Sequence, residues 1–358
     1  MDINELLIFT KKNKASDLHL VAGLPPTLRI NGEIVPIRIN ALSPSETLSM
    51  IQSIMNDKQK ALYEQQLEID FSIHLGEHGR FRINAFHTIN GAAAVLRDIP
   101  HKISSIEELK LPKILEKIAF LSKGLVLVTG PTGSGKSTTL AAIVNHINEN
   151  IGCHILTIED PVEFVHKSKQ SLVNQRELGT NTLSFANALR SALREDPDVI
   201  LIGELRDLDT IRLALTAAET GHLVLATLHT SSAAKSIDRI IDVFPEGDKS
   251  MARSMLSSSI EAVITQLLLK KIDNSGRVAA FEILLANPAI RNLIRDDKVP
   301  QIFSIMQVNS KSGMKTLKNS VQELLEQGLI SEDQVKTALN FAEEDDNDGN
   351  NSISKIKY

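Results

Sequence analysis

Cysteine is nearly absent from the sequence, and this absence excludes several kinds of site. Cys153 is the only one, so no intramolecular disulfide can form and no CxxC pair can hold zinc. A lone cysteine fits a reducing compartment. Aromatic residues are also scarce, with no Trp and two Tyr, so the core must be built from Leu, Ile, Val and Ala.

Long apolar runs and an excess of positive charge are missing as well. No run reaches the roughly 18 residues that span a bilayer. The start, Met1 to Glu5, lacks the basic and then apolar order of a signal peptide. We therefore expect a cytoplasmic protein that meets a membrane only through a partner. The net charge of −5 gives no support for direct nucleic-acid binding, which usually shows a basic stripe.

The length of 358 residues predicts two domains. Residues 1–100 have the pattern of an α+β domain. Its elements are a hairpin turning at Asn31-Gly32, a helix over about 42–67, and strands near 17–21, 69–73, 79–86 and 92–97. A linker is predicted over 101–110, a second domain over 111–341, and an acidic, disordered tail over 342–358.

Four short apolar runs characterise the second domain, at 125–129, 155–159, 199–202 and 223–227. They alternate with helical stretches, which is typical of a parallel sheet covered by helices on both faces. From residue 250 to about 341 the pattern predicts mostly helix.

A phosphate-binding loop follows the first of these strands. The motif G-x-x-x-x-G-K-[ST] is matched in full between a predicted strand and a predicted helix, which is the context its chemistry requires. Backbone N–H groups and a helix N-terminus converge there on phosphate oxygens. The alternative is a glycine-rich turn with a chance lysine, which the complete motif disfavours. The predicted nucleotide-binding residues are Gly130, Pro131, Thr132, Gly133, Ser134, Gly135, Lys136, Ser137 and Thr138.

Polar residues also follow the other three strands. Glu204 comes after the strand over 199–202, at the edge where doubly wound sheets place ligands. Glu159, Asp160 and Glu163 come at the end of another strand, where mutual repulsion suggests a divalent cation or an attacking water. His229 follows the last strand. A solvated loop glutamate and a satisfied core histidine remain the alternatives for Glu204 and His229.

These segments together resemble the motifs of the secretion ATPases. Residues 130–138, 158–163, 198–204 and 220–229 are similar to the Walker A motif, Asp box, Walker B motif and His box of that family. The resemblance runs from about residue 3 to 340. Residues 13–20 and the run Ala289–Ile294 are similar to the opening and to the AIRNLI signature of the branch that retracts type IV pili.

The resemblance implies a fold, an activity and partners. It implies a PAS-like α+β domain before a RecA-like P-loop NTPase domain of the α/β class. It implies a homo-hexamer that hydrolyses ATP with Mg²⁺ to power pilus retraction and twitching motility at the cytoplasmic face of the inner membrane. The expected partners are the pilus platform protein and a paralogous retraction ATPase.

The resemblance also implies roles for single residues. Lys136 binds phosphate, and Ser137, Glu163 and Glu204 manage Mg²⁺ and the attacking water. His229 resembles the family's sensor of the γ-phosphate. Arg82 and Arg97 match arginines of the N-terminal domain that reach the phosphates, although ordinary surface ion pairs are the alternative.

The run Ala289–Ile294 carries a further expectation. Its four apolar residues fall on one helical stripe, so Arg291 and Asn292 are expected to point away from the core. Resemblance to the retraction branch then suggests that these two side chains serve retraction and not ATP hydrolysis.

Several rival functions stay open. An accessory retraction ATPase shares all of these motifs. Pilus-assembly and type II secretion ATPases usually carry a longer N-terminal region and a four-cysteine zinc module, which one cysteine and 358 residues disfavour. A nucleic-acid translocase lacks support from a basic channel. A regulatory module that binds ATP without turnover is disfavoured by the presence of Lys136, Glu163 and Glu204.

Overall fold

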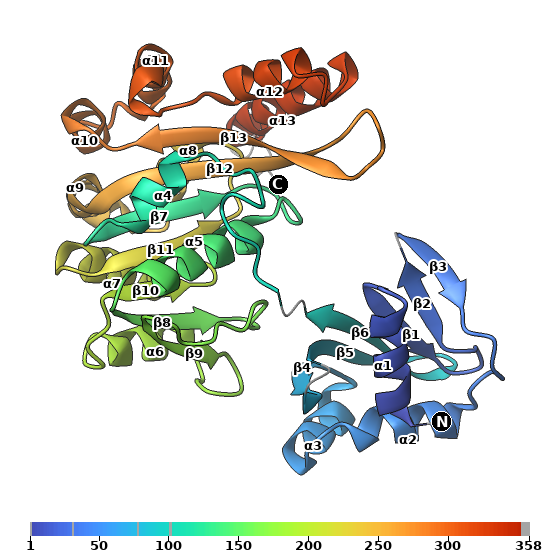
Figure 1. The fold of residues 1–358 in the computed structure, drawn as a ribbon. Helices are drawn as coiled ribbons and strands as arrows, with labels where there is room; N and C mark the ends of the chain where they lie inside the picture. The colour runs from blue at the N-terminus through green and yellow to red at the C-terminus, as the bar shows by residue number, and fades with distance from the viewer. Residues whose placement is uncertain (1, 31, 77–78, 100–101, 352–358) are drawn as a thin grey trace, which may run out of the picture. The chain divides into compact units, whose positions relative to one another are not determined.

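The chain divides into two compact units in the computed structural model (Figure 1). The structure describes residues 2–30, 32–76, 79–99 and 102–351, and of residues 342–351 it describes the backbone only. The first unit comprises the chain up to residue 102 together with residues 163–165. The second comprises residues 103–162 and the chain from residue 166 onward.

The N-terminal unit is built on an antiparallel sheet, with six strands in the described residues in the order β3-β2-β1-β6-β5-β4. Three helices pack with it around one apolar core. The strands are β1 (Asp17–Val21), β2 (Thr27–Ile30), β3 (Glu33–Pro36), β4 (Glu68–His74), β5 (Arg80–Thr88) and β6 (Gly91–Ile99). The helices are α1 (Ile3–Lys12), α2 (Pro44–Ser53) and α3 (Asp57–Gln66).

The strands predicted in this unit are present, but the long helix is divided. Ser43 caps α2 as expected, whereas Asn56 caps a new helix by accepting from the N–H of Gln59. The Gln59 side chain accepts from the Asn56 N–H in return, and this reciprocal pair sets the break. The hairpin pairs Ile30 with Glu33, as predicted, while Asn31 lies outside the described residues.

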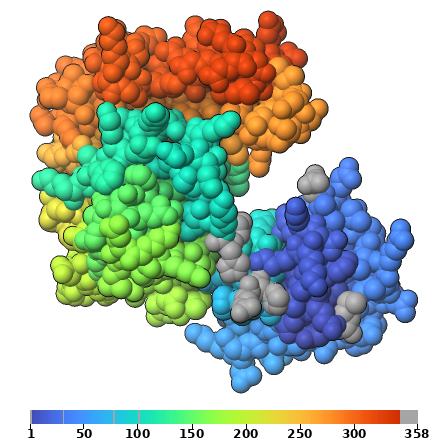
Figure 2. Space-filling view, viewed as in Figure 1, coloured from blue at the N-terminus to red at the C-terminus, as the bar shows by residue number. Residues whose placement is uncertain are grey.

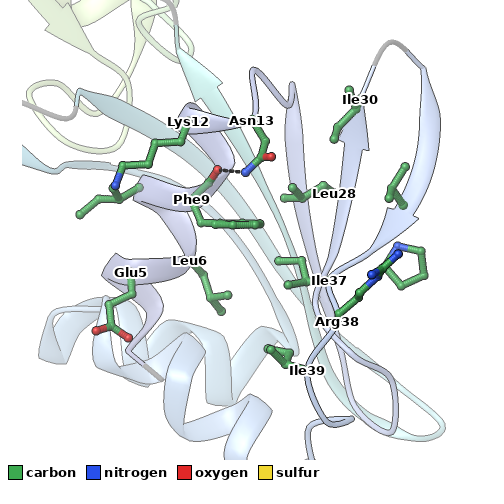
Figure 3. A pocket seen from close by; sticks show the side chains of 13 residues that line it. Glu5, Leu6, Phe9, Lys12, Asn13, Leu28, Ile30, Ile37, Arg38 and Ile39 are labelled. Atoms are coloured by element: carbon green, nitrogen blue, oxygen red, sulfur yellow. Dashed lines mark hydrogen bonds between the residues drawn. The ribbon is translucent and has the colours of Figure 1, made fainter.

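An apolar groove of about 700 Å³ lies between α1 and the β2–β3 hairpin (Figure 3). Its floor is formed by aliphatic side chains such as Leu6, Leu28 and Ile37, and Phe9 stands at its side with 42% of its surface exposed. The strand β3 forms one edge of the sheet at this groove.

The second unit is built on a mixed sheet in the order β13-β12-β7-β11-β10-β8-β9. All pairings are parallel except that of β12 with β13. The strands are β7 (Gly124–Thr129), β8 (His154–Glu159), β9 (Leu172–Glu177), β10 (Val199–Ile202), β11 (Leu223–Leu228), β12 (Ile260–Lys270) and β13 (Arg277–Leu285). The four predicted strands are present as β7, β8, β10 and β11, and β9, β12 and β13 are additional.

Helices cover both faces of this sheet, as predicted for a parallel sheet (Figure 1). The helices α4 (Ile114–Ala119) and α5 (Lys136–Asn150) pack on one face. The other face is covered by α6 (Phe185–Ala192), α7 (Leu208–Glu219), α8 (Ala233–Asp242), α9 (Lys249–Ser259), α10 (Pro288–Arg295) and α11 (Ile302–Val308). Within this unit, the C-terminal helices and the β8–β9 region form opposite ends (Figure 2).

The prediction of mostly helix between residues 250 and 341 is wrong for β12 and β13. Residues 262–266 of β12 are buried at every position without alternation, and such a run cannot be told from a buried helix by periodicity alone. The strand forms because Ile260 to Thr265 pair with β7, while the core on one side of the sheet buries Ile260 and Val263 and the core on the other side buries Ala262 and Ile264. The remainder includes α12 (Leu317–Glu326) and α13 (Glu332–Asn351), which are helical as expected.

The structure describes part of the predicted linker and part of the predicted tail. Helix α13 continues to Asn351, so the backbone of residues 342–351 is helical where a disordered tail was expected. Propagating a helix that is already nucleated costs little, and Ala338 anchors the helix in a core. Residues 352–358 of that tail lie outside the described residues. In the predicted linker, Ile106 is buried against α4 and α5. No helix in the described part of the chain is long and apolar enough to cross a bilayer.

Candidate active site

The phosphate loop connects β7 to α5. All six residues of β7 are buried, which fixes the point where the loop begins. Gly130 and Gly135 have φ angles of 134° and 92°, in the region that favours glycine. A Cβ at Gly130 would lie 2.2 Å from the carbonyl oxygen of Gln266, so no other residue fits there. Gly133 has open space instead, and both it and Thr132 are exposed.

Lys136 begins α5 and folds back over the loop. Its ammonium donates to the carbonyl oxygens of Gly130 at 2.8 Å and Pro131 at 3.0 Å. It also lies 3.4 Å from Nδ1 of His229. Since an ammonium can only donate, Nδ1 accepts, and the proton of a neutral His229 is on Nε2. The sequence-predicted lysine and histidine are therefore in contact.

Glu204 stands directly beyond β10, as predicted. Its Oε1 is 3.5 Å from Nε2 of His229, and its Oε2 accepts from Arg206 at 2.8 Å. This hydrogen bond raises the pKa of Arg206. The Thr227 hydroxyl donates to the Gly203 carbonyl and so ties the end of β10 to β11. The structure thus brings Lys136, His229 and Glu204 into one continuous line of contacts.

The carboxylates that follow β8 are held apart. Glu159 accepts from the Thr157 hydroxyl at 2.6 Å and from the Gln175 amide at 3.0 Å, while Asp160 lies 3.8 Å from Arg206. Glu163 is exposed and groups with the N-terminal unit. Within the described residues, no three His, Cys, Asp or Glu side chains could hold a metal ion together. Glu159 and Asp160 thus each have a separate partner, and the role of these carboxylates toward a divalent cation or an attacking water stays a prediction.

Hydroxyl groups line the remainder of the loop. Ser134 is buried, and its Oγ has no hydrogen-bond partner among the described residues. Buried polar atoms are nearly always satisfied, so this hydroxyl is available to a bound group. Ser137 and Thr138 are half-buried in the first turn of α5.

Arg82 and Arg97 lie opposite one another on β5 and β6 of the N-terminal unit. Each has a carboxylate partner in its own sheet, at 2.6 Å to Asp70 and 2.8 Å to Asp17 respectively. Burial alone would raise the pKa of Asp17, but hydrogen bonds from Ser16 and Arg97 outweigh it and lower that pKa. Both arginines are thus ion-paired, and both remain partly exposed.

Comparison with known proteins adds a family. The family model described as "Type II/IV secretion system protein" matches residues 2–337, which is most of the chain. The chain belongs to this family. The line of contacts from the phosphate loop to Glu204 therefore lies at the place where the family resemblance located the Walker A motif, the His box and the Walker B motif.

Relatives within the family are similar over most of their length. A "Twitching motility protein" of Neisseria gonorrhoeae is 60% identical over 87% of this chain and 83% of its own. The "Type IV pilus retractation ATPase PilT" of Pseudomonas aeruginosa is 55% identical over 96% and 99%. A crystal structure of the pilus retraction motor PilT with bound ADP matches with a TM-score of 0.89 and 45% identity over 94% and 97%. The predicted α/β fold, with a smaller domain ahead of the ATPase domain, is confirmed.

Three polar residues near the family's phosphate loop were not predicted. Gln266 contacts the loop from β12, and the Thr265 hydroxyl lies 2.8 Å from that of Thr129. Arg206 holds Glu204. The signal for Arg206 was its place two residues after Glu204. Thr265 and Gln266 could not be predicted, because the segment that forms β12 was expected to be helical.

Proposed function

We propose that this chain is an ATPase that powers the retraction of type IV pili, the process behind twitching motility. One observation carries the proposal. The type IV pilus retraction ATPase of Pseudomonas aeruginosa aligns with 96% of this chain, and the alignment covers 99% of that relative. The contacts of Lys136 with His229 and of His229 with Glu204 support hydrolysis as the activity.

The phosphate loop suits ATP with Mg²⁺. When ATP binds, the Lys136 ammonium exchanges its hydrogen bonds to the loop carbonyls for contacts with the β- and γ-phosphates. The Ser134 hydroxyl, which has no hydrogen-bond partner among the described residues, belongs to the same loop. Oxygen donors are the ligands that Mg²⁺ prefers, so the Ser137 hydroxyl would hold the ion, and Glu204 and Glu163 would act on it through water. When bound, Mg²⁺ neutralises charge on the phosphates.

Hydrolysis then depends on the residues beyond the loop. Glu204 orients the attacking water with the carboxylate that His229 and Arg206 hold in place. His229 senses the γ-phosphate, since its ring lies between Lys136 and Glu204. A proton on Nε2 lets His229 donate toward Glu204 or toward a phosphate oxygen.

A ring of six identical subunits completes the account. The domain over residues 111–341 hydrolyses ATP, and the domain over residues 1–100 supplies Arg82 and Arg97 to a neighbouring subunit's phosphates. Arginine suits this role because its planar guanidinium neutralises negative charge in the transition state. Supplied by a neighbouring subunit, it does so only when the hexameric ring closes. A homo-oligomer of this kind closes by rotational symmetry.

The motor works at the cytoplasmic face of the inner membrane, where ATP is supplied. It contacts the membrane only through the platform protein of the pilus, and a paralogous retraction ATPase is a further partner. The names of the relatives, which refer to twitching and to type IV pili, support this setting.

Deletion of the gene, followed by counting of surface pili, tests the proposal. Retraction removes pili, so the deletion strain should carry more of them than its parent. A loss of pili would instead indicate an assembly ATPase, and an unchanged number would contradict a principal role in retraction.

A further inference from the structure

We propose that Gln266 is a positioning residue of the phosphate loop. Its main chain and its side chain brace the loop at Gly130, at Gly135 and at the first turn of α5, and so hold it in the shape that binds phosphate. The inference deepens the proposed nucleotide site and rests on it.

The placement of Gln266 follows from the register of β12. This strand runs parallel to β7 and pairs Thr265 with Thr129, the last residue before the loop. The two threonine hydroxyls lie 2.8 Å apart. The next residue along β12 is therefore beside Gly130, and Gln266 is buried there with 3% of its surface exposed.

Three contacts join Gln266 to the two ends of the loop. Its carbonyl oxygen occupies the space of a Cβ at Gly130, 2.2 Å from the ideal position. Its Nε2 lies 2.8 Å from the position of a Cβ at Gly135. Its Oε1 accepts from the Thr139 hydroxyl at 2.6 Å, one turn into α5. One residue thus touches the start of the loop, the end of the loop and the helix that follows.

The chemistry of the side chain matters as well as its size. The neighbours on the same face of β12 are aliphatic, Ile264 and Leu268, so an apolar residue would be the simple choice for packing. A methionine would fill similar space but would leave the buried Thr139 hydroxyl without this acceptor. The amide fixes α5 relative to β12, and a loop fixed before phosphate arrives loses less entropy on binding.

The contacts also predict which step depends on Gln266. They go to the loop and to α5, whereas Glu204 and His229 are held by each other and by Arg206 and Lys136. Loss of Gln266 should therefore weaken nucleotide binding and raise KM for ATP, with a smaller effect on kcat.

The test compares full-length variants by titration with a fluorescent ADP derivative, together with KM, kcat and thermal unfolding. Gln266→Met and Thr139→Val should each raise the Kd for ADP about tenfold. The Kd of the double variant for ADP should not exceed the higher of the two single-variant values, because the two side chains form one contact. Thr139→Ser keeps the hydroxyl and should bind nearly as the wild type does.

Ile264→Val is the matched control, two residues earlier on the same face of β12. It should lower the unfolding temperature without changing the Kd. The proposal is overturned if Gln266→Met lowers the unfolding temperature but leaves the Kd for ADP within twofold of the wild-type value. It is also overturned if the increases in Kd caused by Gln266→Met and Thr139→Val multiply in the double variant. A wild-type protein that binds ADP but does not retract pili would contradict the proposed function and leave this test intact.

Discussion

His229 is the residue on which the proposed site depends most, since its two ring nitrogens face Lys136, proposed to bind phosphate, and Glu204, proposed to orient the water. The contact with Lys136 sets the tautomer of the ring, and the tautomer sets what the ring offers to Glu204. A histidine in this place connects phosphate recognition with the chemistry of the attacking water.

Lys136→Ala and Glu204→Ala are expected to fail in different ways. Lys136 contacts phosphate in the ground state, so its loss should raise the Kd for ATP by about 10- to 100-fold. Glu204 acts on the water, so Glu204→Ala should bind ATP normally and lose about 10²- to 10⁴-fold in kcat. Equilibrium binding and phosphate release measured on the same preparations separate the two effects.

Glu246→Ala provides the control for that experiment. Glu246 is an exposed carboxylate paired with Lys249, and its loss should change neither binding nor turnover. Turnover by Glu204→Ala at close to the wild-type rate would remove Glu204 from the proposed chemistry.

Much of this residue-scale site was predictable, for a simple reason. Strands in a parallel sheet end at a common edge, so Lys136, Glu204 and His229 could be expected together from their places after apolar runs. The partners of Glu159 and Asp160 could not, because the sequence does not say that Gln175 of β9 and Arg206 reach them. Arg80 and Arg82 could be placed on one face of a strand, but the ion pair of Arg97 with Asp17 joins residues 80 positions apart in the sequence.

Helix α10 is present, but one of its side chains differs from its predicted role. Arg291 was expected to point away from the core, but it is half-buried. Its guanidinium donates to the carbonyl oxygens of Ser257 and Ser258, both at 2.9 Å, and to Glu261 at 2.7 Å. These carbonyls lie at the C-terminus of α9, where a positive charge is favourable. Arg291 thus joins α10 to the junction of α9 with β12.

Arg291→Ala should therefore reduce stability. The change leaves two helix-terminal carbonyls and one carboxylate without this donor, and we expect the free energy of unfolding to fall by about 1–3 kcal/mol. Urea denaturation measures the difference. Asn292→Ala, at an exposed position of the same helix, should change it by less than about 0.5 kcal/mol and serves as the control.

Equal stability of the two variants would contradict the bracing role of Arg291. The result also decides how a retraction role for α10 is tested. Because Arg291 is part of the fold, a loss of retraction in Arg291→Ala has a structural explanation. Asn292 is exposed, so a loss of retraction in Asn292→Ala would indicate a lost contact with another molecule and not a change of fold.

The elements themselves were predictable where periodicity was unambiguous. The alternation of Phe81 and Ile83 with arginines marked β5, and four short apolar runs marked the central strands. The burial of β12 on both faces removed the alternation that identifies a strand. The break between α2 and α3 depends on a capping pair at Asn56 and Gln59 inside a continuous helical pattern.

At the scale of the whole molecule, the proposed hexamer makes a direct prediction. The N-terminal domain carries Arg82 and Arg97 but no phosphate loop, and in the proposal these arginines complete a site only when subunits associate. Mass measurement in the presence of ATP should give six times the mass of one chain. Full ATPase activity from a monomer would contradict the assembly, and Arg82→Ala with unchanged turnover would remove that arginine from the site.

The central claim is that ATP hydrolysis at this site powers pilus retraction, and one measurement tests it most directly. The chromosomal gene is replaced by the Glu204→Ala allele, and single labelled pili are followed on living cells. The account predicts normal levels of the protein, an excess of surface pili, and pili that extend but do not retract. Retraction at the wild-type rate and frequency in that strain would contradict it.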